Sequence, residues 1–195
     1  MTRSATVHRA TSETTLDVTL TLDGEGRVDA ATGLPFLDHM LHALGRHARF
    51  DLRVRAAGDL HVDDHHTVED TALALGAALA EALGDRRGVR RFGSAYAPLD
   101  EALCRAVVDL SGRPWPEIHL GLTREALGGV ATENLTHFFV SLAMAARMNL
   151  HVDLIRGSND HHKAEAAFKA TALALRAAVA HDGSHDVPST KGTLA

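Results

Sequence analysis

The sequence predicts an α+β fold of two similar halves, in which amphipathic helices pack against each other and sheets cover them on the outside. Apolar residues alternate with polar ones from Leu16 to Leu22, the pattern of a half-buried strand. From Phe36 to Leu44 the apolar residues instead recur at helical spacing. The same order of motifs then returns later in the chain, which indicates an internal duplication.

The elements of the first half follow from periodicity and turn residues. Two strands are expected in residues 13–31, on either side of a turn at residues 23–26. Pro35 opens a helix over residues 36–49. Short strands are expected at 51–57 and 59–62, and Asp64 is the expected N-cap of a helix that runs to about Leu83 and ends at Gly84.

The second half begins after a basic connector at residues 85–93 and repeats this order. We expect strands at 94–98, 102–110, 115–120 and 149–155, helices at about 133–148 and 161–180, and irregular segments at 121–131 and 181–195. His39 and His137 are 98 residues apart, and the Asp-His-His segments that begin at Asp64 and Asp160 are 96 residues apart. The halves are therefore expected at about 1–93 and 94–195, fused into one domain.

The composition is that of an ordinary globular chain, because 45% of its 195 residues are hydrophobic and 23% are charged. The net charge of −5 gives no electrostatic argument for nucleic acid or an anionic membrane as a partner. A single cysteine, Cys104, excludes an internal disulfide framework and cysteine-rich metal sites. No apolar stretch approaches the ~20 residues of a membrane span, and no secretion signal is visible. We therefore expect a cytoplasmic protein.

Histidine is unusually frequent, with 14 residues, and two histidine pairs belong to a repeated H-H-x-x-E motif at residues 65–69 and 161–165. At a helix start His65 and Glu69 share a face, whereas His66 points roughly 100° away. Each motif thus presents two ligands to one ion and one ligand to another. Imidazole and carboxylate without thiolate suit a divalent metal such as manganese, iron or zinc. The competing interpretation is a buried network of histidine and glutamate.

Two related motifs present three ligands to each of two ions, and His39 and His137 bring each ion to four. The spacing leaves open whether both motifs of one chain meet at one site. Similar halves often place matching elements on opposite faces, so ligands from two neighbouring subunits are a natural alternative.

A second group of residues predicts an anion site. Lys191 lies in the turn Pro188-Ser189-Thr190-Lys191-Gly192, where hydroxyls, backbone N–H groups and a cation suit a phosphate. Lys169 follows His161 by about two helical turns, and Arg91 and Arg113 stand at loop or strand ends. Taken singly, each arginine is more typical of a solvated surface charge.

These motifs resemble those of the imidazoleglycerol-phosphate dehydratases of histidine biosynthesis, in the monofunctional form without a fused phosphatase domain. The similar segments occur in the family's order and cover nearly the whole chain. They are FLDHMLHALGRH (36–47), DDHHTVEDTALALG (63–76), RRFG (90–93), PLDEAL (98–103), VDLSGRP (108–114), DHHKAEAAFKA (160–170) and PSTKG (188–192).

The resemblance implies four helices sandwiched between two four-stranded sheets, a homo-24-mer with active sites at subunit interfaces, and two Mn²⁺ per active site. It assigns one ion to His39, His66, His161 and Glu165. The other ion is assigned to His65, Glu69, His137 and His162.

The resemblance also implies roles toward a phosphorylated imidazole substrate. Glu13 and His47 face this substrate together with His39, His65 and His161. Its phosphate is held by Arg91, Arg113, Lys169, Ser189, Thr190 and Lys191. Glu69 and Glu165 count with Glu13 and His47 as catalytic, and Asp100 and Glu101 lie near the site.

The implied reaction removes water from imidazole glycerol phosphate and leaves imidazole acetol phosphate. The hydrogen lost from carbon is not beside a carbonyl, so the ring must accept the electrons. Two Mn²⁺ on the ring nitrogens would favour an imidazolate that expels the neighbouring hydroxyl. Glu13 is the first candidate for the proton shuttle, and His47 for assisting the departing hydroxyl.

Two other classes of protein are considered. A dinuclear metallohydrolase also uses histidine and carboxylate ligands, although such sites are usually richer in aspartate and in bridging carboxylates. A metal-storage or metal-sensing protein would leave the PSTKG turn and the two arginines without a role.

Overall fold

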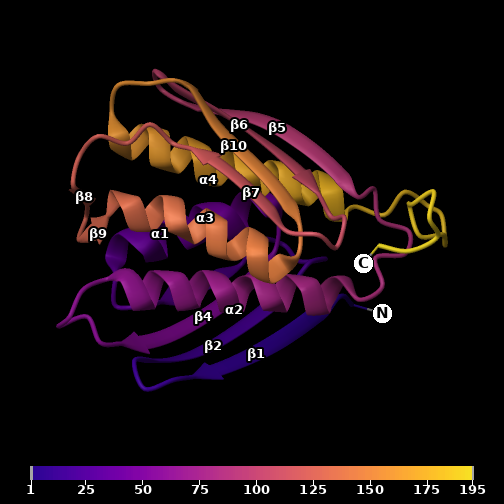
Figure 1. The fold of residues 1–195 in the computed structure, drawn as a ribbon, viewed down its shortest axis with the longest axis horizontal. Coiled ribbons are helices and arrows are strands. Elements are labelled where there is room, and N and C mark those ends of the chain that lie inside the picture. Colours follow the sequence, from indigo (N-terminus) through magenta and orange to yellow (C-terminus); the bar gives the residue numbers. More distant parts are fainter. Residues whose placement is uncertain (1, 195) are drawn as a thin grey trace.

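The structure, a computed structural model, describes residues 2–194, and within them four long helices lie between two four-stranded sheets (Figure 1). The first half consists of β1 (Ser4–Ala10), β2 (Thr14–Thr21), β3 (Val28–Ala31), α1 (Pro35–Ala48), β4 (Asp51–Gly58) and α2 (His65–Leu83). The second half consists of β5 (Phe92–Leu99), β6 (Ala102–Asp109), β7 (Trp115–His119), α3 (Thr132–Ala146), β10 (Asn149–Arg156) and α4 (Asp160–Val179). A small hairpin of β8 (Ala126–Leu127) and β9 (Val130–Ala131) precedes α3.

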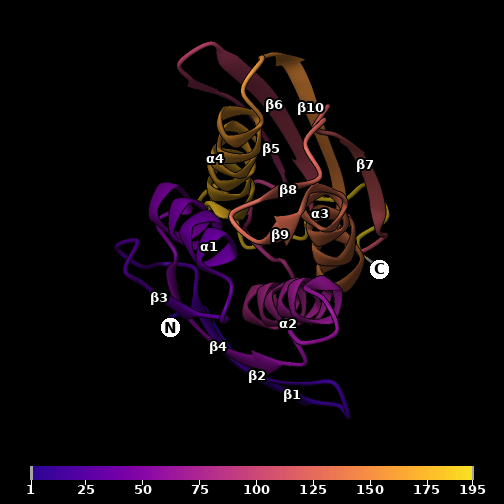
Figure 2. The same cartoon turned by 90° about the vertical axis from the view of Figure 1, so that its left-hand side faces the viewer.

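The two sheets have the same topology, which confirms the predicted duplicated α+β fold. Their strand orders are β1-β2-β4-β3 and β5-β6-β10-β7. β3 pairs in parallel with β4, and β7 pairs in parallel with β10. The remaining pairs in both sheets are antiparallel. Seen end-on, the helices form the middle layer and the sheets the two outer layers (Figure 2).

The helices join the halves as well as covering the sheets. α2 packs on β1 and β2, and α4 packs on β5 and β6, while α2 pairs with α3 and α1 pairs with α4 across the duplication. The core explains why β2 alternates, because Leu16, Val18 and Leu20 are at most 1% exposed and face the helices. Gly76 permits the close crossing of α2 and α3, since a Cβ there would lie 2.7 Å from the carbonyl oxygen of Leu142.

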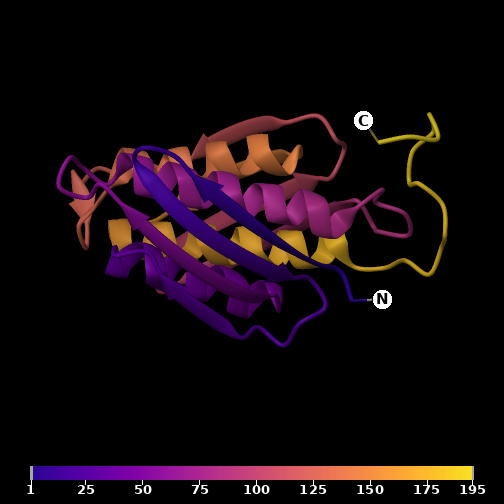
Figure 3. The same cartoon turned by 90° about the horizontal axis from the view of Figure 1, so that it is seen from below.

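Both chain ends lie at the same end of the molecule (Figure 3). Residues 181–194 extend from the C-terminal end of α4, opposite the end where α2, α3 and α4 begin (Figure 1). Within residues 2–194 no helix is both long enough and apolar enough to cross a membrane.

Several expected elements differ from the structure. Strand β1 was not predicted, because Ser4–Ala10 is an edge strand whose sequence lacks a regular apolar alternation. The expected strand at 59–62 is wrong: the N–H of Val62 donates to the carbonyl of Asp59 across 2.8 Å, which closes a turn. The expected loop at 121–131 contains the short hairpin β8–β9.

Asp64 is the N-cap residue of α2, as expected, but its side chain does not cap the helix. Its side chain does not bind the first turn of α2 but accepts a hydrogen bond from the N–H of Ala131 at 2.9 Å, which ties α2 to the start of α3. Asp63 accepts from the N–H of His65 instead, at 2.9 Å. The expected end of this helix at Gly84, which has a φ of 55°, is confirmed.

Candidate active site

The first cluster of potential metal ligands joins the beginnings of α1 and α4. Nε2 of His39 lies 3.1 Å from Oε2 of Glu165, and Nε2 of His161 lies 3.3 Å from the same oxygen. The three ligand atoms lie within 4.8 Å of one another. Asn159 caps α4 by accepting from the N–H groups of His161 and His162, which fixes the turn that carries these histidines.

The second cluster joins α2 and α3 in the same manner. Nε2 of His137 lies 3.0 Å from Oε1 of Glu69, and Nε2 of His65 lies 3.7 Å from its Oε2. The rings of His65 and His137 stack with centroids 5.0 Å apart, so their Nε2 atoms face the same carboxylate. Each cluster therefore takes ligands from both halves of the chain.

The donor chemistry of both clusters fits a divalent cation, because two imidazoles converge on one carboxylate in each. Burial would raise the pKa of Glu165, but hydrogen bonds from Lys169 and His39 outweigh burial and lower this pKa to about 2. The carboxylate is thus ionised at any physiological pH.

His66 and His162 belong to neither cluster within the described chain. Their rings stand nearly perpendicular to those of their neighbours, at 81° between His65 and His66 and 88° between His161 and His162. We call these two residues, which lie outside both clusters, the outer histidines.

A pocket of about 330 Å³ adjoins the first cluster along α1 and α4. His39, His47 and Lys169, three residues expected to face substrate, line it together with Glu165 in one chain. Burial, and then the positive charge of Lys169, lower the pKa of His47, which keeps this imidazole neutral near pH 7. Nζ of Lys169 lies 2.6 Å from Glu165.

His42 and Arg46 also line this pocket and were missed by the sequence analysis. They follow His39 by three and seven residues, so the helical spacing that revealed the apolar face of α1 also contained this signal.

Glu13 lies in the turn between β1 and β2, next to an outer histidine. Its Oε1 is 3.7 Å from Nε2 of His66, and its side chain is half exposed. In the second half Asp100 occupies the matching turn between β5 and β6, with Oδ2 3.8 Å from Nε2 of His162. Glu13 and His47 do not meet within one chain, because Glu13 lies beside His66 whereas His47 lines the pocket next to the first cluster.

The residues expected to hold phosphate are divided between two places. Lys169 lies in the pocket, whereas Arg91 and Arg113 lie near the C-terminal ends of α4 and α3. Arg91 forms a bidentate pair with Asp109, at 2.7 and 3.1 Å, and donates to the carbonyl of Pro188 at 2.9 Å. This contact anchors the turn of Ser189, Thr190 and Lys191, in which the N–H of Lys191 donates to Oγ of Ser189 at 3.2 Å.

That turn and the two arginines lie at the end of the molecule opposite the clusters, because α4 separates them. A helix of the 20 residues of α4 is about 30 Å long. One chain therefore brings together two clusters of potential metal ligands and a pocket lined by some of the predicted substrate residues, but not the complete predicted set.

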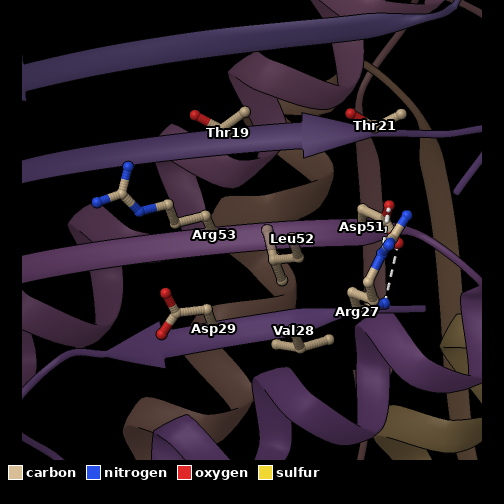
Figure 4. A pocket seen from close by; sticks show the side chains of 8 residues that line it. All are labelled: Thr19, Thr21, Arg27, Val28, Asp29, Asp51, Leu52 and Arg53. Atoms are coloured by element: carbon tan, nitrogen blue, oxygen red, sulfur yellow. Dashed lines mark hydrogen bonds and ion pairs between the residues drawn. The ribbon is translucent and has the colours of Figure 1, made fainter. Parts of the chain in front are cut away.

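A second pocket, of about 300 Å³, lies on the outer face of the first sheet (Figure 4). Arg27, Asp29, Asp51 and Arg53 surround it, and the carboxylate of Asp51 binds the N–H of Arg27 at 2.9 Å. It contains none of the residues predicted from the sequence.

Comparison with known proteins agrees with this geometry. Residues 32–175 match the sequence profile of the family described as imidazoleglycerol-phosphate dehydratase. An imidazoleglycerol-phosphate dehydratase of Kluyveromyces lactis is 50% identical over 98% of this chain and 97% of its own length. One of Scheffersomyces stipitis is 48% identical over the full length of both chains. One of Phytophthora nicotianae is 57% identical over 99% of this chain, which spans 43% of that longer protein.

Solved structures show the same fold. The imidazoleglycerol-phosphate dehydratase of Staphylococcus aureus is 36% identical, with a TM-score of 0.83 over 91% of this chain and 99% of its own. The enzyme of Pyrococcus furiosus, solved in complex with (S)-C348, is 37% identical, with a TM-score of 0.84 over 96% of this chain and all of its own. The duplicated fold, the two clusters and these likenesses agree: the chain belongs to the imidazoleglycerol-phosphate dehydratase family of hydro-lyases.

Proposed function

We propose that the chain dehydrates imidazole glycerol phosphate to imidazole acetol phosphate in histidine biosynthesis, with two Mn²⁺ in each active site. The observation that carries the proposal is the pair of His-His-Glu clusters, each built from both halves of a chain that belongs to this family.

The residues present would hold two ions. His39, His161 and Glu165 would bind one, and His65, Glu69 and His137 the other. When bound, these ions supply Lewis-acid stabilisation of negative charge on the substrate's imidazole ring. The outer histidines belong to neither cluster of the described chain, so the fourth ligand of each ion would come from another copy of the chain.

The same division supports an assembly with shared sites, for which the family resemblance suggests 24 copies. The clusters lie where the helices begin, and the PSTKG turn lies at the opposite end. A phosphate held by Arg91, Arg113, Ser189 and Lys191 can then approach a cluster only if a second copy supplies these residues. Phosphate binding remote from the reacting carbons orients the substrate and lowers the entropic cost of the reaction.

Two proton movements complete the reaction. The proton lost from carbon needs a base, and Glu13 is a candidate because it is half exposed and borders an outer histidine. The hydroxyl on the carbon next to the ring leaves with a proton as water, and the resulting enol becomes the ketone. His47 is neutral near pH 7, so it can orient the departing hydroxyl by hydrogen bonding.

The experiment that tests this function follows the fate of the phosphate. The purified chain, loaded with Mn²⁺ and given imidazole glycerol phosphate, should form a ketone that retains its phosphate, as ³¹P and ¹H NMR would show. Release of inorganic phosphate would instead establish a metallohydrolase. Metal binding without turnover would indicate storage or sensing.

A further inference from the structure

Three of the four histidines in the paired motifs have Nδ1 bound by an oxygen acceptor. Nδ1 of His66 lies 3.1 and 3.2 Å from the two carboxylate oxygens of Asp59, and Nδ1 of His162 lies 2.7 Å from Oε2 of Glu101. Nδ1 of His65 lies 2.9 Å from Oδ1 of Asn134. An ionised carboxylate can only accept a hydrogen bond, so Asp59 and Glu101 require a proton on Nδ1.

The opposite ring nitrogen of each outer histidine is consequently available. Among residues 2–194, the carboxylates nearest to Nε2 are Glu13 at 3.7 Å from His66 and Asp100 at 3.8 Å from His162, which is too far for hydrogen bonds. In a neutral imidazole with a proton on Nδ1, the lone pair is on Nε2. This is the atom through which the histidines of both clusters also face their glutamates.

The two carboxylates are themselves held in place. Oε1 of Glu101 accepts from the N–H groups of Asn159 and Ser158, at 2.8 and 3.1 Å, which leaves Oε2 for His162. Asp59 is fixed through its backbone, whose N–H donates to the carbonyl of Glu13 at 3.1 Å.

The duplication does not account for this similarity. Asp59 directly follows β4, whereas the residue that directly follows β10 is Gly157, which has no side chain to offer. The second half supplies its carboxylate from Glu101, in the turn between β5 and β6. Two unrelated positions thus reach the same ring atom of equivalent histidines, which indicates a shared requirement rather than an inherited contact.

We infer that Asp59 and Glu101 are positioning residues that hold Nδ1 of His66 and His162, so that Nε2 of each outer histidine is presented to a metal ion. The inference rests on the proposed function, because it assigns these residues to the ligands of that site. Such carboxylates fix the ring and increase its basicity, and their loss typically weakens metal binding 10–100-fold.

The test measures the dissociation constant of Mn²⁺ for the full-length chain by electron paramagnetic resonance of the free ion. Asp59→Ala and Glu101→Ala should each raise this constant about 10- to 100-fold for the affected ions. Asp59→Asn and Glu101→Gln retain an acceptor oxygen and should lie closer to the wild type. Asp17→Ala is the matched control, since Asp17 binds Nδ1 of His8 at 2.9 Å on the outer face of the first sheet.

A double-variant cycle separates positioning from a general structural effect. In the background of His66→Ala, the further change Asp59→Ala should leave the Mn²⁺ dissociation constant unchanged, because Asp59 acts through His66. The same holds for Glu101→Ala in the background of His162→Ala. The melting temperature of each metal-free variant shows whether its fold is intact.

Each outcome of the cycle decides the matter. If the wild-type chain binds Mn²⁺ and dehydrates its substrate but the alanine variants bind as tightly, the inference is wrong and the proposed function stands. If Asp59→Ala weakens Mn²⁺ binding equally in the wild-type and His66→Ala backgrounds, Asp59 is a structural residue and the inference is also wrong. A wild-type chain that binds no Mn²⁺ would overturn both.

Discussion

Nε2 of His39 lies 3.1 Å from Oε2 of Glu165, although 126 residues separate the two in the sequence. The contact joins α1 of the first half to α4 of the second, and the contact of His137 with Glu69 joins α3 to α2. Neither half could form a cluster alone. The duplication therefore explains why the H-H-x-x-E motif occurs twice. Because α1 pairs with α4 and α2 pairs with α3, each cluster needs residues from both halves of the chain.

Removal of metal should abolish activity. Chelation with EDTA, or exposure to about pH 5, is expected to strip the ions, because histidine must be neutral to bind a metal. Glu165 remains ionised at pH 5, since its pKa is about 2, so the loss on acidification belongs to the histidines. Turnover before and after dialysis, and after readdition of Mn²⁺, checks this. Full activity in the metal-free chain would contradict the proposed metal dependence.

Loss of a phosphate contact should mainly raise KM. Lys191→Ala and Arg113→Ala each remove a charge-assisted contact worth roughly 1.5–3 kcal/mol, which is tenfold or more in kcat/KM. Phosphate is bound in the ground and transition states alike, so kcat should change little. Steady-state kinetics measures both constants, with Arg53→Ala on the outer sheet face as a control. An effect confined to kcat would speak against phosphate binding.

Substitution of Glu13 should have the opposite effect. Glu13→Gln keeps the size of the side chain but cannot take a proton, so kcat should fall by about 10²–10⁴-fold with KM little changed. Metal content should be retained, because Glu13 lies outside both clusters. Mass spectrometry of bound metal and steady-state kinetics check the two expectations. A near-normal kcat would remove Glu13 from the mechanism.

A buried ion pair stabilises the beginning of α4. Nζ of Lys163 lies 2.8 Å from Asp160 and donates to the carbonyl of Gly121 at 2.9 Å, and both charged side chains are at most 7% exposed. Lys163→Ala leaves Asp160 without its cation, which should cost about 3 kcal/mol, the lower end of the range for a broken buried pair. The N–H groups of Thr123 and Arg124 still bind Asp160 and limit the loss.

For a chain of this length the change corresponds to a decrease in melting temperature of roughly 6–12 °C. Arg105→Ala, which breaks a partly exposed pair with Asp153, is the control and should shift the melting temperature less. Equal decreases in melting temperature for the two variants would show that burial of the Lys163 pair adds nothing to the stability of the fold.

The sequence predicted the layers of the fold because its signals were periodic. The alternation in β2 and the helical spacing in α1 report which side of each element is buried, and both were correct. The signal failed at Ser4–Ala10, where an edge strand has no continuous buried face. It located the N-cap of α2 correctly at Asp64 but did not show that this side chain binds the distant Ala131 instead of the first turn.

The candidate site could likewise be predicted only where its geometry is local to one helix. The i,i+4 spacing predicted that His161 and Glu165 share a face, since this geometry is local to one helix. No local rule connects Asp59 with His66 or Glu101 with His162, because loops bring these residues together. No local pattern indicates that Lys163 is buried, because its amine is covered by the distant Gly121, whose carbonyl accepts from it.

The separation of the outer histidines from the clusters is tested most directly by the activity of hybrid assemblies. One variant carries Glu69→Ala and Glu165→Ala, and the other carries His66→Ala and His162→Ala. Each should be inactive alone, whereas hybrids purified through a different tag on each variant should regain dehydratase activity, because an intact cluster can meet intact outer histidines of another copy. Hybrids that contain both variants and remain as inactive as either one alone would contradict sites shared between copies.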